Sequence, residues 1–161
     1  MNTSLQRGPK EAPKFLTDIA PLTILVVDDS RSFGDLAAAL LELEPWTHVV
    51  GQARSGAEAL EKIVSLHPDV VLMDVQMTPM GGLTAAALIG WLFPQSRVVM
   101  MSSDDSPRLR AECAASGATA FIHKSSFIAD FFQAIGPIAR EQTNQQRALA
   151  KRDQQMRALA V

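Results

Sequence analysis

The chain has 161 residues, is 47% hydrophobic and carries a formal net charge of −2. This length suits one domain with tails, and the apolar content excludes wholesale disorder. The single cysteine, Cys113, excludes an internal disulfide and fits a cytoplasmic setting. The charge balance leads us to expect that the chain itself binds no nucleic acid. The lack of a long apolar run leads us to expect that it does not bind a membrane.

The first 21 residues contain three prolines and no regular hydrophobic period, which predicts a flexible leader at residues 1–21. Charged residues interrupt this segment throughout, so it lacks the hydrophobic region of a signal peptide. We expect a folded domain over residues 22–137 and a polar helical tail over residues 138–161.

From residue 24 onward, short runs of aliphatic and β-branched residues alternate with segments of helical period. A short unbroken apolar run is typical of a strand that is buried on both faces of a parallel sheet. Segments in which apolar residues recur at steps of three and four are typical of amphipathic helices. In chain order, the sequence predicts strand 24–27, helix 33–43, strand 48–53, a helix from Ser55, strand 70–73, helix 84–93, strand 98–101, a helix from Pro107, strand 120–123 and helix 127–135.

Local residues mark the ends of several predicted helices. Ser55 and Glu58 have the spacing of a capping box, in which the serine accepts a backbone N–H and the glutamate reaches back to the helix start. Gly117 suits the left-handed residue that often ends a helix. Gly136 and Pro137 predict the end of helix 127–135, because proline removes a donor and disfavours the helical conformation of the residue before it.

This alternation of strands and helices predicts an open five-stranded parallel α/β sheet with helices on both faces. Ligands of such sheets bind at the carboxyl ends of the strands. Polar or charged residues follow four of the predicted strands and form the candidate site: Asp28, Asp29, Asp74, Ser102 and Lys124.

These residue types indicate phosphoryl chemistry. Neighbouring carboxylates repel one another unless they are protonated or bind a cation, and a set of oxygen ligands favours Mg²⁺. An aspartate beside such an ion can be a nucleophile towards phosphorus, and Lys124 and Ser102 offer a positive charge and a hydroxyl to the phosphoryl oxygens. Taken singly, an acid after a strand is more often a helix cap and a lysine a solvated charge, but the combination favours the functional interpretation.

Between residues 22 and 138 the chain resembles the receiver domain of two-component response regulators. The resemblance rests on the order and spacing of four segments. These are Ile-Leu-Val-Val-Asp-Asp-Ser at 24–30, Pro-Asp-Val-Val-Leu-Met-Asp-Val-Gln-Met at 68–77, Val-Val-Met-Met-Ser-Ser at 98–103 and Gly-Ala-Thr-Ala-Phe-Ile-His-Lys at 117–124. The stretches 44–45 and 49–51 favour the NarL/FixJ-like subgroup.

The resemblance implies a flavodoxin-like fold of the receiver type and a phosphoacceptor rather than an enzyme, with slow self-dephosphorylation. Asp74 would accept a phosphoryl group from a sensor histidine kinase or a phosphotransfer protein. Asp29 would bind Mg²⁺ directly, Asp28 would bind it largely through water, and the backbone carbonyl of Gln76 would be a further ligand.

The resemblance also implies a switch. Lys124 and Ser102 would hold the phosphoryl oxygens, and Phe121 would be the aromatic residue that turns inward as Ser102 moves. The surface altered by phosphorylation would comprise the fourth helix, the fifth strand and the fifth helix. Phe121 is equally well interpreted as a plain core aromatic.

The sequence departs from the family pattern in two places. Thr78 stands where a proline is usual, with Pro79 after it, so the loop after Asp74 is expected to have an altered shape. Lys124 is followed by Ser125 instead of the common proline. Because cis peptide bonds are largely confined to X–Pro, the conformation of the Lys124–Ser125 bond stays open.

Residues 138–161 are polar and favour a helix, which we expect to be separate from the preceding one. An isolated polar helix is marginal in water. We therefore expect the tail either to fray or to be ordered by a partner, most simply a second copy of the chain in a homodimer through Leu149, Met156 and Leu159.

Two alternative functions remain at this point. The tail is too small for a helix-turn-helix output domain, so the chain is either a stand-alone receiver or a receiver fragment of a DNA-binding transcriptional regulator. Residues 74–78 also faintly resemble the signature of aspartate-nucleophile phosphatases, which requires a second acid where Gln76 stands. Turnover of a generic phosphomonoester would identify such a phosphatase.

Overall fold

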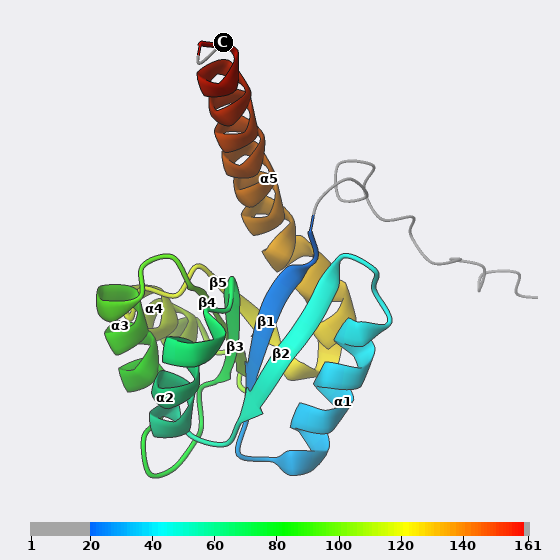
Figure 1. The fold of residues 1–161 in the computed structure, drawn as a ribbon. Helices are drawn as coiled ribbons and strands as arrows, with labels where there is room; N and C mark the ends of the chain where they lie inside the picture. The colour runs from blue at the N-terminus through cyan, green and yellow to red at the C-terminus, as the bar shows by residue number, and fades with distance from the viewer. Residues whose placement is uncertain (1–19, 160–161) are drawn as a thin grey trace, which may run out of the picture.

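Five parallel strands form one sheet in the order β2-β1-β3-β4-β5 in the computed structural model, which describes residues 20–159 (Figure 1). The predicted leader therefore lies almost entirely outside the described residues. The strand order confirms the predicted open parallel sheet. The strands are β1 (Leu22–Val27), β2 (Thr47–Ala53), β3 (Val70–Asp74), β4 (Arg97–Ser102) and β5 (Ala120–His123).

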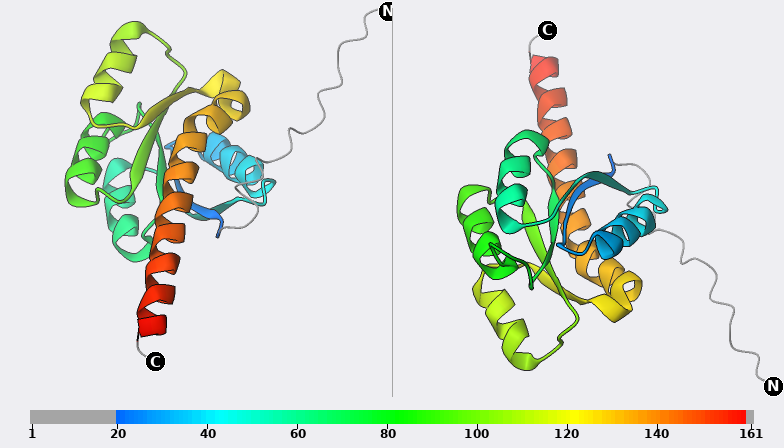
Figure 2. Two further views of the ribbon diagram at one scale, coloured as in Figure 1. Left: turned by 90° about the horizontal axis from the view of Figure 1, so that it is seen from above. Right: turned by 90° about the horizontal axis from the view of Figure 1, so that it is seen from below.

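Helices cover both faces of the sheet, as predicted (Figures 1 and 2). Helices α1 and α5 pack on one face, and α2, α3 and α4 pack on the other. In the part of the chain that the structure describes, no helix is both long enough and apolar enough to cross a bilayer. The helices are α1 (Arg31–Glu42), α2 (Gly56–Leu66), α3 (Gly82–Leu92), α4 (Pro107–Ala115) and α5 (Phe127–Leu159), with a 3₁₀ turn, η2 (Lys124–Ser126), before α5.

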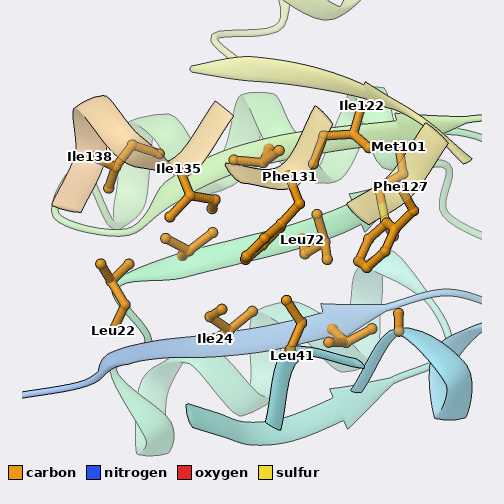
Figure 3. Close-up of a cluster of buried hydrophobic side chains, with 14 of the residues drawn as sticks. Leu22, Ile24, Leu41, Leu72, Met101, Ile122, Phe127, Phe131, Ile135 and Ile138 are labelled. Carbon is orange, nitrogen blue, oxygen red and sulfur yellow. The ribbon is translucent and has the colours of Figure 1, made fainter. Parts of the chain in front are cut away.

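Side-chain alternation divides the core into two clusters. In β1, Ile24 and Val26 point towards α1 and α5, and Leu25 and Val27 point towards α2 and α3. The central strand β3 is buried at every position, which explains its unbroken apolar run. Figure 3 shows the first cluster, in which the side chain of Phe131 extends from α5 towards the sheet.

The predicted helix caps are present, with one change of partner. The Ser55 hydroxyl accepts the Glu58 N–H at 3.2 Å, as in a capping box. The Glu58 carboxylate accepts the Arg54 N–H at 2.8 Å, one residue before the expected partner. Gly117 follows α4 with a φ of 87°, the left-handed conformation predicted for it.

The prediction of two helices separated at Gly136–Pro137 is wrong, because α5 is one helix of 33 residues that contains Pro137. Gly136 carries no Cβ, so the usual clash between proline and the preceding side chain is reduced. Packing also continues across the proline, since Ile135 and Ile138 are both buried against the sheet (Figure 3).

The attachment of α5 to the domain extends beyond the predicted boundary at residue 138. Glu141 forms an ion pair with Arg97 of β4 at 2.9 Å. Thr143 is 2% exposed and donates its hydroxyl to the carbonyl of Ala139 at 2.7 Å. Beyond this point the helix projects away from the sheet and ends with Leu159 (Figure 1).

Candidate functional site

Three aspartates gather where β1 and β3 end. Oxygens of Asp28, Asp29 and Asp74 all lie within 4.8 Å of one another. Parallel pairing of β1 with β3, in which Val27 lies opposite Met73, brings the residues that follow β1 beside the end of β3. The sheet order changes direction at these strands, since β2 lies on the outer side of β1, and such points are the usual binding sites of open α/β sheets.

Lys124, which follows the edge strand β5, brings a positive charge to these acids. Its Nζ donates to Asp28 Oδ2 at 2.6 Å and lies 3.2 Å from Asp74 Oδ1. The side chains of Asp28 and Asp74 are 0% and 6% exposed, so the ammonium neutralises charge that water does not reach. Lys124 follows β5 directly, and Asp28 also accepts the Ser30 N–H at 2.9 Å.

The electrostatic environment of Asp74 disfavours its charged form. Burial raises the pKa of the Asp74 carboxyl above its usual value; the Lys124 ammonium opposes this rise and the negative charge of Asp28 adds to it. The neighbouring Asp29 carboxylate is exposed. Two buried acids therefore share a single lysine beside a third, exposed acid, which leaves negative charge for a further cation to neutralise.

The donor set fits a hard divalent cation. Carboxylate oxygens are ligands that Mg²⁺ prefers, and Asp28, Asp29 and Asp74 are close enough to hold one ion jointly. The loop after β3 returns closely over Asp74: a Cβ on Gly82 would lie 2.0 Å from the Asp74 carbonyl oxygen. Gln76, the proposed carbonyl ligand, lies in this loop with an exposed side chain.

The structure gives the conformation of two peptide bonds at which the sequence departs from the receiver pattern. The Thr78–Pro79 bond is the cis peptide recorded among residues 20–159, and the Lys124–Ser125 bond is accordingly trans.

Ser102 and Phe121 lie on β4 and β5, the two strands that follow β3 in the order of the sheet. Ser102 ends β4, is buried, and accepts the Asp104 N–H on its hydroxyl at 3.0 Å. Phe121 of β5 is half-buried, and the guanidinium of Arg110 lies 4.5 Å from its ring centroid. Both side chains are thus engaged by the β4–α4 segment, while the ion pairs of Lys124 run to Asp28 and Asp74.

One neighbour of the site was not predicted from the sequence. Lys124 Nζ lies 4.5 Å from the centroid of the Phe33 ring on the first turn of α1. Phe33 was predicted only as one apolar position of a helix. The position of Phe33 soon after Asp28 and Asp29 was the available signal, because it places the start of the helix beside the end of β1.

Comparisons with known proteins agree on one family. A model described as "Response regulator receiver domain" matches residues 24–136. A protein-glutamate methylesterase/protein-glutamine glutaminase of Thermotoga maritima is 35% identical over 127 residues, 77% of this chain and 37% of that protein. The transcriptional regulatory protein LnrK of Bacillus subtilis is 34% identical over 64% of this chain and 47% of that protein.

Solved structures agree with the sequence matches. The signal receiver domain of the response regulator NarL from Mycobacterium tuberculosis superposes with a TM-score of 0.71 at 31% identity, over 76% of this chain and 98% of that domain. The chain spans less than half the length of the two curated relatives, whose covered shares are 37% and 47%. The similarity therefore extends over only a part of each of these two proteins.

Proposed function

The chain belongs to the response regulator receiver domain family, and from this premise we propose that it is a phosphorylation-dependent switch with Asp74 as the phosphoacceptor. The observation that carries the proposal is the arrangement of Lys124, which lies 3.2 Å from a buried Asp74 beside two further carboxylates. A carboxylate nucleophile, a neighbouring positive charge and a set of metal ligands together suit phosphoryl transfer to a carboxylate.

In the proposed reaction, an oxygen of Asp74 attacks the phosphorus of a phosphohistidine on a sensor kinase or phosphotransfer protein. The P–N bond of the donor breaks as the P–O bond forms, and the donor histidine keeps the electron pair. Lys124 moves from Asp28 towards the new phosphoryl oxygens and stabilises their charge. Mg²⁺ held by Asp28, Asp29 and Asp74 would neutralise the remaining negative charge.

Transmission of the signal would use Ser102 and Phe121. We infer that the Ser102 hydroxyl leaves the Asp104 N–H and donates to a phosphoryl oxygen. The β4–α4 segment would follow, and Phe121 would leave its contact with the Arg110 guanidinium. The surface of α4, β5 and α5 would change as a result, and it would contact the output partner.

The matched relatives support a receiver role without singling out one output. One is named a methylesterase and the other a transcriptional regulator, and both are longer than this chain. We therefore propose membership of the NarL/FixJ-like subgroup on the residues at 44–45 and 49–51, with support from the similarity to the NarL receiver. A receiver fragment of a DNA-binding regulator is the second candidate, and its support is the similarity to LnrK.

Phosphorylation with acetyl phosphate and Mg²⁺, followed by intact-mass measurement, tests the proposal. We expect one phosphoryl group on the wild-type chain and none on Asp74→Asn. Asp69→Asn is the control, because Asp69 precedes β3 and so lies at the opposite end of this strand from Asp74. Its carboxylate accepts the Thr23 N–H at 2.8 Å. Unchanged labelling of Asp74→Asn would exclude Asp74 as the acceptor, and rapid turnover of p-nitrophenyl phosphate would instead favour the phosphatase alternative.

A further inference from the structure

The Lys124 ammonium has an aromatic neighbour in addition to its two carboxylates. The ammonium nitrogen lies 4.5 Å from the centroid of the Phe33 ring, within the range of a cation–π interaction. The Lys124 side chain is only 14% exposed, so water competes weakly for the ammonium. Phe33 therefore contacts a group that the proposed reaction requires to move.

We propose that Phe33 is a positioning residue for phosphoryl transfer, an inference that rests on the proposed function of Asp74. The ring face holds the ammonium beside the acids and remains in contact with it as it turns from Asp28 to the phosphoryl group. A carboxylate alone would hold the cation at a fixed partner. The quadrupole of an aromatic ring attracts a cation over its whole face, so it permits a short movement.

The ring also forms part of the wall of a hollow that borders Lys124. A hollow of about 210 Å³ lies between α1 and the start of α5 and opens on Lys124. Without an aromatic face there, the ammonium could turn into this hollow and be hydrated, away from Asp74. Phe33 of α1 and Phe127 of α5 line this hollow together with Lys124.

The orientation of Phe33 is fixed by a row of aromatic rings. Phe127 meets it edge to face, with centroids 5.8 Å apart and an angle of 87°. Phe127 stacks on Phe131 at 5.8 Å, and Phe131 stacks on Trp46 at 6.0 Å. Because Phe131 and Trp46 are buried in the core, the ring under Lys124 is supported from the inside of the domain.

Two substitutions at one position separate the aromatic face from simple bulk. Phe33→Leu keeps an apolar side chain but removes the ring, and Phe33→Tyr keeps the ring. Phe132→Leu is the matched control, because Phe132 is an aromatic residue of the same layer that contacts Trp46, at 5.6 Å, instead of Lys124. A Phe33 variant carrying 3,4,5-trifluorophenylalanine preserves the shape and weakens the quadrupole, should the leucine variant fold poorly.

The first measurement is the NMR chemical shift of the Lys124 side chain in the unphosphorylated protein, assigned by comparison with Lys124→Met. The ring current of Phe33 should shift the ε protons upfield in wild type, Phe33→Tyr and Phe132→Leu, and Phe33→Leu should lose that shift. The second is the initial rate of phosphorylation by acetyl phosphate with Mg²⁺. That rate should fall by about three- to tenfold in Phe33→Leu, in proportion to the lost interaction, with the half-saturating donor concentration unchanged.

The outcomes distinguish the positioning role of Phe33 from the proposed function of Asp74, on which it rests. If wild type and every variant fail to take up a phosphoryl group, the proposed function is wrong and the positioning role falls with it. A normal rate in both Phe33→Leu and the trifluorinated variant would overturn the positioning role alone. An equal loss of rate in Phe132→Leu and Phe33→Leu would also overturn it, because that result would indicate general loss of packing.

Discussion

Lys124 and Asp28, which lie 96 positions apart in the chain, form an ion pair of 2.6 Å that is almost closed to solvent. This lysine is therefore paired in the unphosphorylated chain with an acid of β1, at a shorter distance than the 3.2 Å to the proposed acceptor Asp74. Phosphorylation would require this pair to lengthen or break. The pair thus couples the stability of the domain to the state of its site.

Replacement of Lys124 by methionine should destabilise the domain, because two buried carboxylates lose their cation. We expect a loss of about 2–4 kcal/mol in the free energy of unfolding at neutral pH, partly restored by Mg²⁺. Urea denaturation with and without MgCl₂ measures it. Lys62→Met is the control: Lys62 pairs with Glu58 at 2.7 Å with 39% exposure, and its loss should cost less than about 1 kcal/mol. Equal losses would contradict the prediction.

Asp74→Asn should make the metal-free domain more stable at neutral pH. Burial raises the pKa of Asp74, so the folded state binds a proton more readily than the unfolded state does. Its contribution to stability is complete below the ordinary carboxyl pKa and is lost as pH rises through the folded value. The gain in Tm of Asp74→Asn should thus be largest at pH 7 and shrink towards pH 4, measured in EDTA. A lower Tm for the variant at pH 7 would contradict this.

Gly82→Ala should disturb the acceptor, because its Cβ would lie 2.0 Å from the Asp74 carbonyl oxygen. Displacing this backbone should destabilise the domain by about 1–3 kcal/mol and slow phosphorylation. Gly90→Ala is a control in the same helix, where an added Cβ meets no atom within 4 Å. It should stabilise by about 0.5–1 kcal/mol through the helix preference of alanine. Urea midpoints and intact-mass rates report both effects, and similar behaviour of the two variants would argue against close approach at Gly82.

Asp29→Ala should weaken Mg²⁺ binding more than Asp28→Ala does. Asp29 is exposed, whereas Asp28 already holds Lys124 and the Ser30 N–H. We expect a loss of about tenfold or more for Asp29→Ala, as for substitutions around other metal sites. Tryptophan fluorescence is a poor reporter, because Trp46 is buried among the α5 aromatics and Trp91 is 80% exposed on α3. Calorimetric titration of MgCl₂ is therefore the suitable measurement. Equal affinities of wild type and Asp29→Ala would refute the assignment.

The sheet and the acids were predictable because their signals are local. The apolar run of β3 ends at Asp74, and the order of a parallel sheet places all such ends at one edge. The Phe33–Lys124 contact was harder to predict, because the position of Phe33 soon after Asp28 and Asp29 does not reveal how α1 packs beside the turn after β5. Pro137 misled the prediction because packing of Ile135 and Ile138 outweighs the local preference of proline.

The projecting end of α5 should be an association element that is separable from the phosphorylation site. Leu149 and Met156 are 61% and 62% exposed, and their spacing of two helical turns places them on one face. Deletion of residues 144–161 should leave phosphorylation of Asp74 intact and abolish a concentration-dependent dimer. The deletion begins after Thr143 because Glu141 and Thr143 pack on the domain.

Light scattering with and without acetyl phosphate measures the mass of the full-length and shortened chains. Leu149→Gln combined with Met156→Gln should have the same effect as deletion, because it removes the apolar surface and keeps the helix. Gln154→Ala changes the opposite face of the same exposed helix and should leave association unaltered. A dimer that survives both the deletion and the double substitution would place the self-association surface on the domain itself. A full-length chain that is monomeric at every concentration would contradict self-association through Leu149 and Met156.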